Sequence, residues 1–289
     1  MALLLILFGV CTSLAEGVLI KKYNSRHTEG GFFFTGLISL FAMLFFIITD
    51  QDGFYFPEGI WIYSAVAGDL YAAASFMTYM ALRCGSFAMS MLILSYSIVF
   101  TIGYGLIFLK EKTSVYTYVG LAIVMVSLYL TRGKNEESHS EKRSNKFSLK
   151  WLILIVLSAV FSGLYSVVSR MQQIRFENRC TNEFMMIALG ISCLILVVAG
   201  VLKEGKSTRY IIRNGGPYAI GAGISNGITN MLSLVVNTMI AISIASPIRA
   251  SLKIVMSFLL SKLVFKEKFL KRQILGVLLG AVALVLLRM

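Results

Sequence analysis

The sequence predicts an all-α membrane protein with ten transmembrane helices, arranged as two inverted five-helix repeats around a central cavity. Three observations support this fold class: the apolar composition, ten apolar stretches of membrane-spanning length, and an internal repeat. Of the 289 residues, 57% are hydrophobic and only 14% are charged, whereas charged residues make up about 25% of a soluble domain. The composition therefore places the chain in a lipid bilayer.

The ten apolar stretches are separated by short polar connections. Each is close to the roughly 20 apolar residues that one helical crossing requires. They lie at residues 2–20, 31–49, 60–82, 86–109, 114–131, 151–170, 182–202, 217–237, 240–264 and 271–288. The first stretch has no basic segment before its apolar run, so we expect a retained span rather than a signal peptide.

The second half of the chain repeats a pattern of the first at an offset of 156 residues. Lys266-Glu267-Lys268 aligns with Lys110-Glu111-Lys112, and Gly276 aligns with Gly120. Each copy holds five spans, an odd number, so the second copy must enter the membrane in the opposite direction. The chain thus divides into a first five-helix repeat, a polar linker and a second five-helix repeat, at residues 1–131, 132–150 and 151–289.

Positive charge is distributed unevenly among the connections. Most Lys and Arg follow the first, third, fifth, seventh and ninth spans, and by the positive-inside rule this side is cytoplasmic. Both termini are then outside, and we expect the plasma (inner) membrane as the location. The net charge of +13 is explained by these connections, so no nucleic-acid partner is expected.

Three ionisable residues lie deep within predicted spans, where charge costs at least about 2.5 kcal/mol. Asp69 is near the middle of the third span, while Arg249 and Lys253 share one face of the ninth. Two interpretations remain open. Asp69 and Lys253 form a structural ion pair, or all three face a cavity, where the two cations bind an anionic group and Asp69 binds an amine or a proton.

Glu16 is a second candidate proton site. It lies nearer a helix end than Asp69, within reach of Lys21 and Lys22, so we expect an interfacial pair with these lysines.

Polar stripes mark the spans expected to line a cavity, since polar groups avoid lipid. Their members are either interhelical hydrogen-bond partners or substrate ligands. The candidate substrate-binding residues on these stripes are Asn226, Asn230, Ser233, Tyr165 and Tyr104.

Catalytic and metal chemistry have little support in the sequence. The two histidines and four cysteines have no ligand spacing, and no nucleophile is placed beside a base. We expect neither an enzyme, a cofactor nor a metal site.

The two halves resemble the EamA-type members of the drug/metabolite transporter superfamily. The resemblance rests on residues 81–130 and 243–287, where a long helix ends in Glu111 or Glu267 and the next opens with Gly120 or Gly276. It implies that the first, third, fourth, sixth, eighth and ninth helices surround a central cavity, with the fifth and tenth outside.

The sequence therefore predicts a secondary active transporter that works by alternating access. An amino acid or similar zwitterion is the favoured small-molecule substrate, export is the favoured direction, and proton coupling is a hypothesis. The alternative is a non-transporting membrane partner subunit or a lipid-linked sugar translocator of the same fold. We expect a monomer or a homodimer in the bilayer.

Overall fold

The structure is a computed structural model that describes residues 2–50, 53, 55–97, 99, 115–131, 149–177, 179–239, 242–266 and 271–286. The chain is helical over most of these residues, and one 3₁₀ turn, η1 (Gly205–Ser207), joins two of the helices. The α-helices are α1 (Ala2–Arg26), α2 (Phe32–Thr49), α3 (Ile60–Cys84), α4 (Phe87–Ser95), α6 (Val115–Thr131), α7 (Leu149–Arg175), α8 (Thr181–Glu204), α9 (Thr208–Met239), α10 (Ile242–Val264) and α11 (Lys271–Leu286). Most of the predicted linker lies outside the described residues.

Five helical stretches in the described part of the chain are long and apolar enough to cross a membrane. They are Ala2–Arg26, Phe32–Thr49, Ile60–Cys84, Leu149–Arg175 and Thr181–Ser233. A helix satisfies its own backbone hydrogen bonds, as lipid requires. The chain is therefore built as an all-helical integral membrane protein.

Several helices extend beyond the apolar stretches seen in the sequence. α1 continues to Arg26, and α9 begins at Thr208, well before the expected start at residue 217. Pro217 lies within α9. The added helical turns carry polar side chains. A search for apolar runs stops where these side chains begin, although the backbone continues as a helix.

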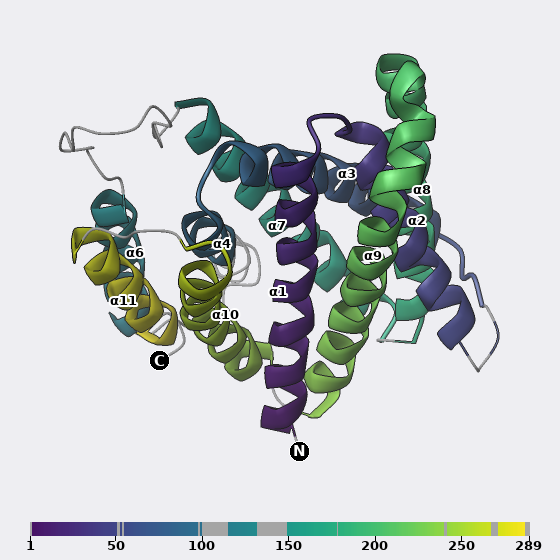
Figure 1. Cartoon of the computed structure of the whole chain (residues 1–289). Helices are drawn as coiled ribbons and strands as arrows, with labels where there is room; N and C mark the ends of the chain where they lie inside the picture. Colours follow the sequence, from purple (N-terminus) through teal and green to yellow (C-terminus); the bar gives the residue numbers. More distant parts are fainter. Residues whose placement is uncertain are drawn as a thin grey trace.

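The helix contacts show a correspondence between the two halves of the chain. In the most extensively packed pairs, when each helix is replaced by its counterpart in the other half, the new pair is also in contact. α1 packs against α9, and α7 correspondingly packs against α3. α2 contacts α9 as α8 contacts α3, while α2 meets α8, α4 meets α10, and α6 meets α11. Figure 1 shows α6 and α11 beside one another at one edge of the bundle, with α1 crossing its centre.

The two ends of the described chain lie on the same side of the bundle. Figure 1 shows the start of α1 at the bottom of the view and the end of α11 at the lower left. The opposite side carries the ends of α1, α3 and α8, with Arg26, Arg83 and Lys203. We call this opposite side the basic side.

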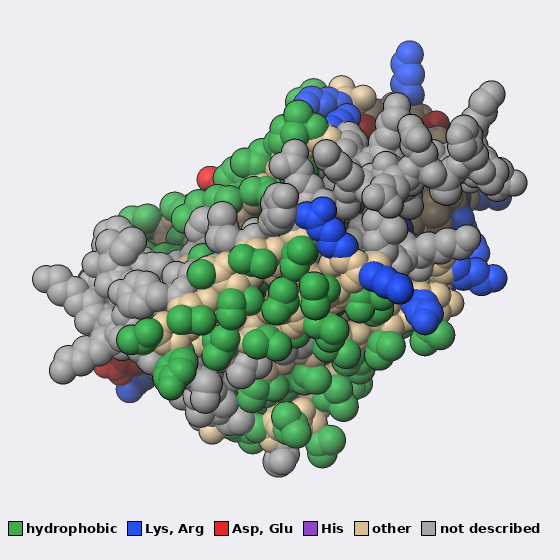
Figure 2. All heavy atoms as spheres, turned by 90° about the vertical axis from the view of Figure 1, so that its left-hand side faces the viewer, with side chains coloured by type: hydrophobic (Ala, Val, Ile, Leu, Met, Phe, Trp, Pro, Cys, Tyr) green, Lys and Arg blue, Asp and Glu red, His purple; other side chains and the backbone are tan. Residues whose placement is uncertain are grey.

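Large apolar side chains remain on the outside of the bundle. Leu263 is 75% exposed and Leu278 is 57% exposed, which in water would be an unusually apolar surface. Figure 2 shows hydrophobic side chains across much of one face, with Lys and Arg gathered toward one side of it. This distribution fits a belt of lipid around the helices.

Candidate functional site

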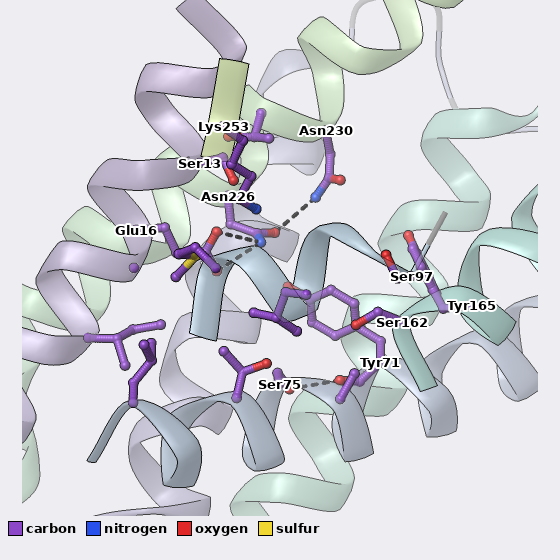
Figure 3. A pocket seen from close by; sticks show the side chains of 18 of the residues that line it. Ser13, Glu16, Tyr71, Ser75, Ser97, Ser162, Tyr165, Asn226, Asn230 and Lys253 are labelled. Carbon is purple, nitrogen blue, oxygen red and sulfur yellow. Dashed lines mark hydrogen bonds between the residues drawn. The ribbon is translucent and has the colours of Figure 1, made fainter. Parts of the chain in front are cut away.

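A cavity of about 340 Å³ lies among α1, α3, α4, α7, α9 and α10, with one contribution from α2. The six main helices correspond to the six that the resemblance implies. Figure 3 shows the polar side chains that converge on it. The polar lining consists of Ser13, Glu16, Thr35, Tyr71, Ser75, Thr78, Ser97, Ser162, Tyr165, Ser166, Asn226, Thr229, Asn230 and Lys253.

Glu16 enters the cavity from α1 and is held by a short chain of amides on α9. The Asn226 Nδ2 amide donates to both carboxylate oxygens of Glu16, at 3.1 and 3.2 Å, and Asn230 Nδ2 donates to Asn226 Oδ1 at 2.9 Å. Residues 226 and 230 lie one turn apart and share a face. The two helices thus fix the carboxylate's position.

The expected pairing of Glu16 with Lys21 and Lys22 is wrong. Lys21 donates instead to the carbonyl oxygen of Gly85, between α3 and α4. Because α1 runs on to Arg26, Glu16 lies well inside the helix, and the lysines lie near its end. Glu16 therefore belongs to the cavity and not to the membrane interface.

Lys253 enters the cavity from α10, within electrostatic range of Glu16. Figure 3 shows the two side chains coming from different helices. Among the described residues, neither an ion-pair contact nor a hydrogen bond joins Lys253 to a partner. The cavity thus holds a carboxylate and an ammonium group that face a shared space without touching.

Arg249 lies one turn before Lys253 on α10 and is not among the residues that line the cavity. Its Nη1 donates to Ser233 Oγ of α9 at 3.1 Å. Its Nη2 is buried and has no hydrogen-bond partner among the described residues. Ser233 therefore contacts the guanidinium and not the cavity.

The structure does not bring Asp69 to Lys253 or to the cavity, contrary to our expectation. Asp69 is exposed and lies nine residues before Thr78, which lines the cavity. At 3.6 residues per turn this spacing puts the two on opposite sides of α3. An ion pair between Asp69 and Lys253 is therefore also absent from the described residues. Tyr104 lies outside the residues that the structure describes.

Two tyrosines form an aromatic wall on the side formed by α3 and α7. The rings of Tyr71 and Tyr165 meet edge to face, with their centroids 5.6 Å apart, and the Tyr165 hydroxyl donates to Met185 Sδ at 3.0 Å. The Tyr71 hydroxyl lies beside Asn226. Sequence reasoning selected Tyr165 but missed Tyr71. The polar spacing of Tyr71, Ser75 and Thr78 was the available signal.

Toward the basic side, a cluster of aromatic residues lies next to residues that line the cavity. Tyr23, one turn beyond the cavity residue Ile20, stacks on Phe34 with centroids 4.0 Å apart, and Tyr79 packs against the same ring. All three side chains are fully buried. Tyr23 and Tyr79 also contact the α1–α2 connection.

Side chains of α1, α3 and α8 form hydrogen bonds with the backbone of the α1–α2 connection and of the first turn of α2. Tyr23 and Tyr79 donate to the carbonyl oxygens of Glu29 and Gly30, at 2.8 and 2.9 Å. The Glu204 carboxylate at the end of α8 accepts the backbone N–H groups of Phe32 and Phe33, at 3.0 and 3.2 Å. These N–H groups begin α2 and have no partner within their own helix.

No group of three or more His, Cys, Asp or Glu side chains that could hold a metal ion occurs among the described residues. The Glu16 carboxylate and the Lys253 ammonium line the cavity, and each is a group that binds an oppositely charged group of a small molecule.

The fold and the cavity together define a class of protein: helical membrane proteins that enclose a polar cavity between their helices. The sequence model of the EamA-like transporter family matches residues 1–133 and 149–289. The chain belongs to this family, whose members are membrane transporters.

The fold is also that of a solved structure. A crystal structure of a protein aligns with this chain at a TM-score of 0.66 and 15% sequence identity, over 98% of this chain and 97% of that one. At this identity the likeness concerns the fold. No curated protein matches the chain.

Proposed function

We propose that this protein is a secondary active transporter that carries a small zwitterion, such as an amino acid, by alternating access. The observation that carries the proposal is the separation of Glu16 and Lys253 across one cavity. A zwitterion bridges two such groups, with its ammonium at Glu16 and its carboxylate at Lys253. The aromatic wall of Tyr71 and Tyr165 adds an electron-rich surface near the ammonium.

The proposal includes ten spans in two inverted repeats. Two observations support it. The family model matches two stretches of the chain, and contacts between helices recur when each helix is replaced by its counterpart in the other half. In this arrangement the basic side is cytoplasmic, both termini are outside, and the location is the plasma membrane. Export then moves the zwitterion from the basic side to the side of the termini.

Glu16 is also the proposed site of proton coupling. Of the two candidate carboxylates, Glu16 lines the cavity and Asp69 does not. A proton and the substrate ammonium compete for the same carboxylate, and such competition is sufficient to couple their movements.

Substrate binding tests this proposal directly. A ligand that binds only the folded state stabilises it by about 2.7 kcal/mol at one hundred times its Kd. We therefore expect the melting temperature of the purified protein to rise with a panel of amino acids. Glu16→Gln and Lys253→Gln should reduce this rise strongly, while Lys262→Gln, at an exposed cation on the same helix as Lys253, preserves it.

Two outcomes would contradict the proposal. One is that no amino acid changes the melting temperature of the wild-type protein. The other is a rise that is equally large in Glu16→Gln and Lys253→Gln, because binding would then not involve the cavity.

A further inference from the structure

We propose that Arg249 forms a second anion subsite beside the cavity, so that the preferred substrate is a small dicarboxylic amino acid. This inference rests on the proposed function and specifies its substrate class. Glu16 binds the amine, Lys253 binds one carboxylate and Arg249 binds the other.

The hydrogen bonding of Arg249 is incomplete. A guanidinium has five N–H donors in a planar fork that matches a carboxylate. Among the described residues, Arg249 donates one hydrogen bond, from Nη1 to Ser233 Oγ. Nη2 is buried and unpartnered among the described residues. Arg249 is half-buried, so water compensates its charge only in part, and the unpartnered Nη2 favours an anionic partner.

The cations outnumber the acids at this place. Arg249 and Lys253 lie one turn apart on α10, close enough to repel one another. Among the described residues that line the cavity, Glu16 carries the negative charge. A neutral zwitterion leaves this excess of positive charge unchanged, whereas a second carboxylate on the substrate neutralises it.

The polar face of α9 connects the two ends of the proposed site. Asn226 contacts Glu16, Asn230 contacts Asn226, and Ser233 contacts Arg249. These three positions are spaced by four and three residues, so they form one stripe along the helix. The stripe leads from the amine position at Glu16 to the guanidinium at Arg249.

The spacing of the two cations suits two groups on one small molecule. Residues four apart in a helix are separated by about 6 Å along its axis, and both side chains are long enough to converge. A dicarboxylic amino acid offers one carboxylate to each.

The test compares the affinities of glutamate, glutamine and glutarate for the purified full-length protein, measured by calorimetry. Glutamine retains the zwitterion but lacks the second charge, and glutarate retains both carboxylates but lacks the amine. We expect wild-type protein to bind glutamate on the order of tenfold more tightly than either, as one charge-assisted hydrogen bond provides.

Arg249→Gln should remove the preference for glutamate over glutamine while retaining glutamine binding. Lys262→Gln is the matched control, because it removes an exposed positive charge from the same helix, and should keep the preference. The wild-type comparison alone decides the inference if Arg249→Gln does not fold.

The outcomes separate this inference from the proposed function. If glutamine binds wild-type protein as tightly as glutamate, the inference is wrong and the zwitterion transporter stands. If the preference persists in Arg249→Gln, the second carboxylate binds elsewhere and the inference is also wrong. If none of the three binds and no other amino acid does, the proposed function fails with it.

Discussion

At the scale of single residues, position along a helix determines which charges meet. Glu16 and Lys253 reach one cavity, while Asp69 lies on the outer side of α3. In the sequence Asp69 and Lys253 appeared deep within their spans and Glu16 nearer a helix end, because depth is counted along the chain. The direction of a side chain depends on which helices pack on which face, and this information is absent from a single span.

The pH dependence of binding is the prediction at this scale. The Glu16 carboxylate attracts a substrate ammonium only when it has lost its proton, so binding should weaken as the pH falls through its titration. The groups facing it are Asn226 and Asn230 from α9, Tyr71 from α3 and Lys253 from α10. Amino-acid affinity measured between acid and neutral pH should show this loss.

Glu16→Gln provides the decisive comparison for that pH dependence. Glutamine keeps the shape and a hydrogen-bond acceptor but has no proton to exchange. Its weaker binding should not vary with pH. An unchanged pH profile in Glu16→Gln would exclude Glu16 as the titrating group.

At the scale of helices, the sequence was informative about where spans lie and uninformative about where they end. Five helical stretches of the described chain are long and apolar enough to span a membrane, because lipid requires both apolar side chains and internal backbone bonds. The run at 86–109 is described as a helix only from Phe87 to Ser95. The polar turns of α1 after residue 20 and of α9 before residue 217 escaped detection. Tyr71 was missed because a tyrosine in an apolar run is more often packing than lining.

Glycine at helix crossings gives a prediction about stability. A Cβ on Gly223 of α9 would lie 2.8 Å from the Ile38 carbonyl oxygen and 3.1 Å from the Ala42 nitrogen of α2, both backbone atoms. Gly223→Ala should therefore force α2 and α9 apart and destabilise the protein by about 1 to 3 kcal/mol. The melting temperature in detergent should fall.

Gly216 is the matched control on the same helix. A Cβ there meets nothing within 4 Å, and alanine favours helix over glycine by roughly 0.8 to 1.0 kcal/mol. Gly216→Ala should thus leave the melting temperature unchanged or raise it. Equal losses in both variants would show that the close contact between α2 and α9 does not control stability.

At the scale of the whole molecule, helices from both parts of the chain surround the cavity, and each part contributes one charged side chain to it. Glu16 belongs to the first half and Lys253 to the second. In the proposed mechanism, a movement of one half against the other would change access to both groups together. The internal repeat predicts a division into two related halves, and this division stays a prediction. The aromatic contacts of Tyr23 and the Glu204 contacts could not be predicted, because they depend on side-chain packing between distant segments.

Glu204 should control opening on the basic side. Its carboxylate holds the first N–H groups of α2, and Glu204→Gln weakens these charge-assisted bonds by removing the charge. Glu183→Gln is the control, since Glu183 accepts the Tyr55 N–H at 3.0 Å near the other end of α8.

The most direct measurement of alternating access is the labelling of Ser75→Cys, a cavity position, by a membrane-impermeant thiol reagent in vesicles of either orientation. The four native cysteines, Cys11, Cys84, Cys180 and Cys193, are first replaced. We predict labelling from both sides, with Glu204→Gln and not Glu183→Gln increasing the rate from the basic side. Labelling from one side only, in every variant and with or without amino acids, would contradict a cavity that opens alternately.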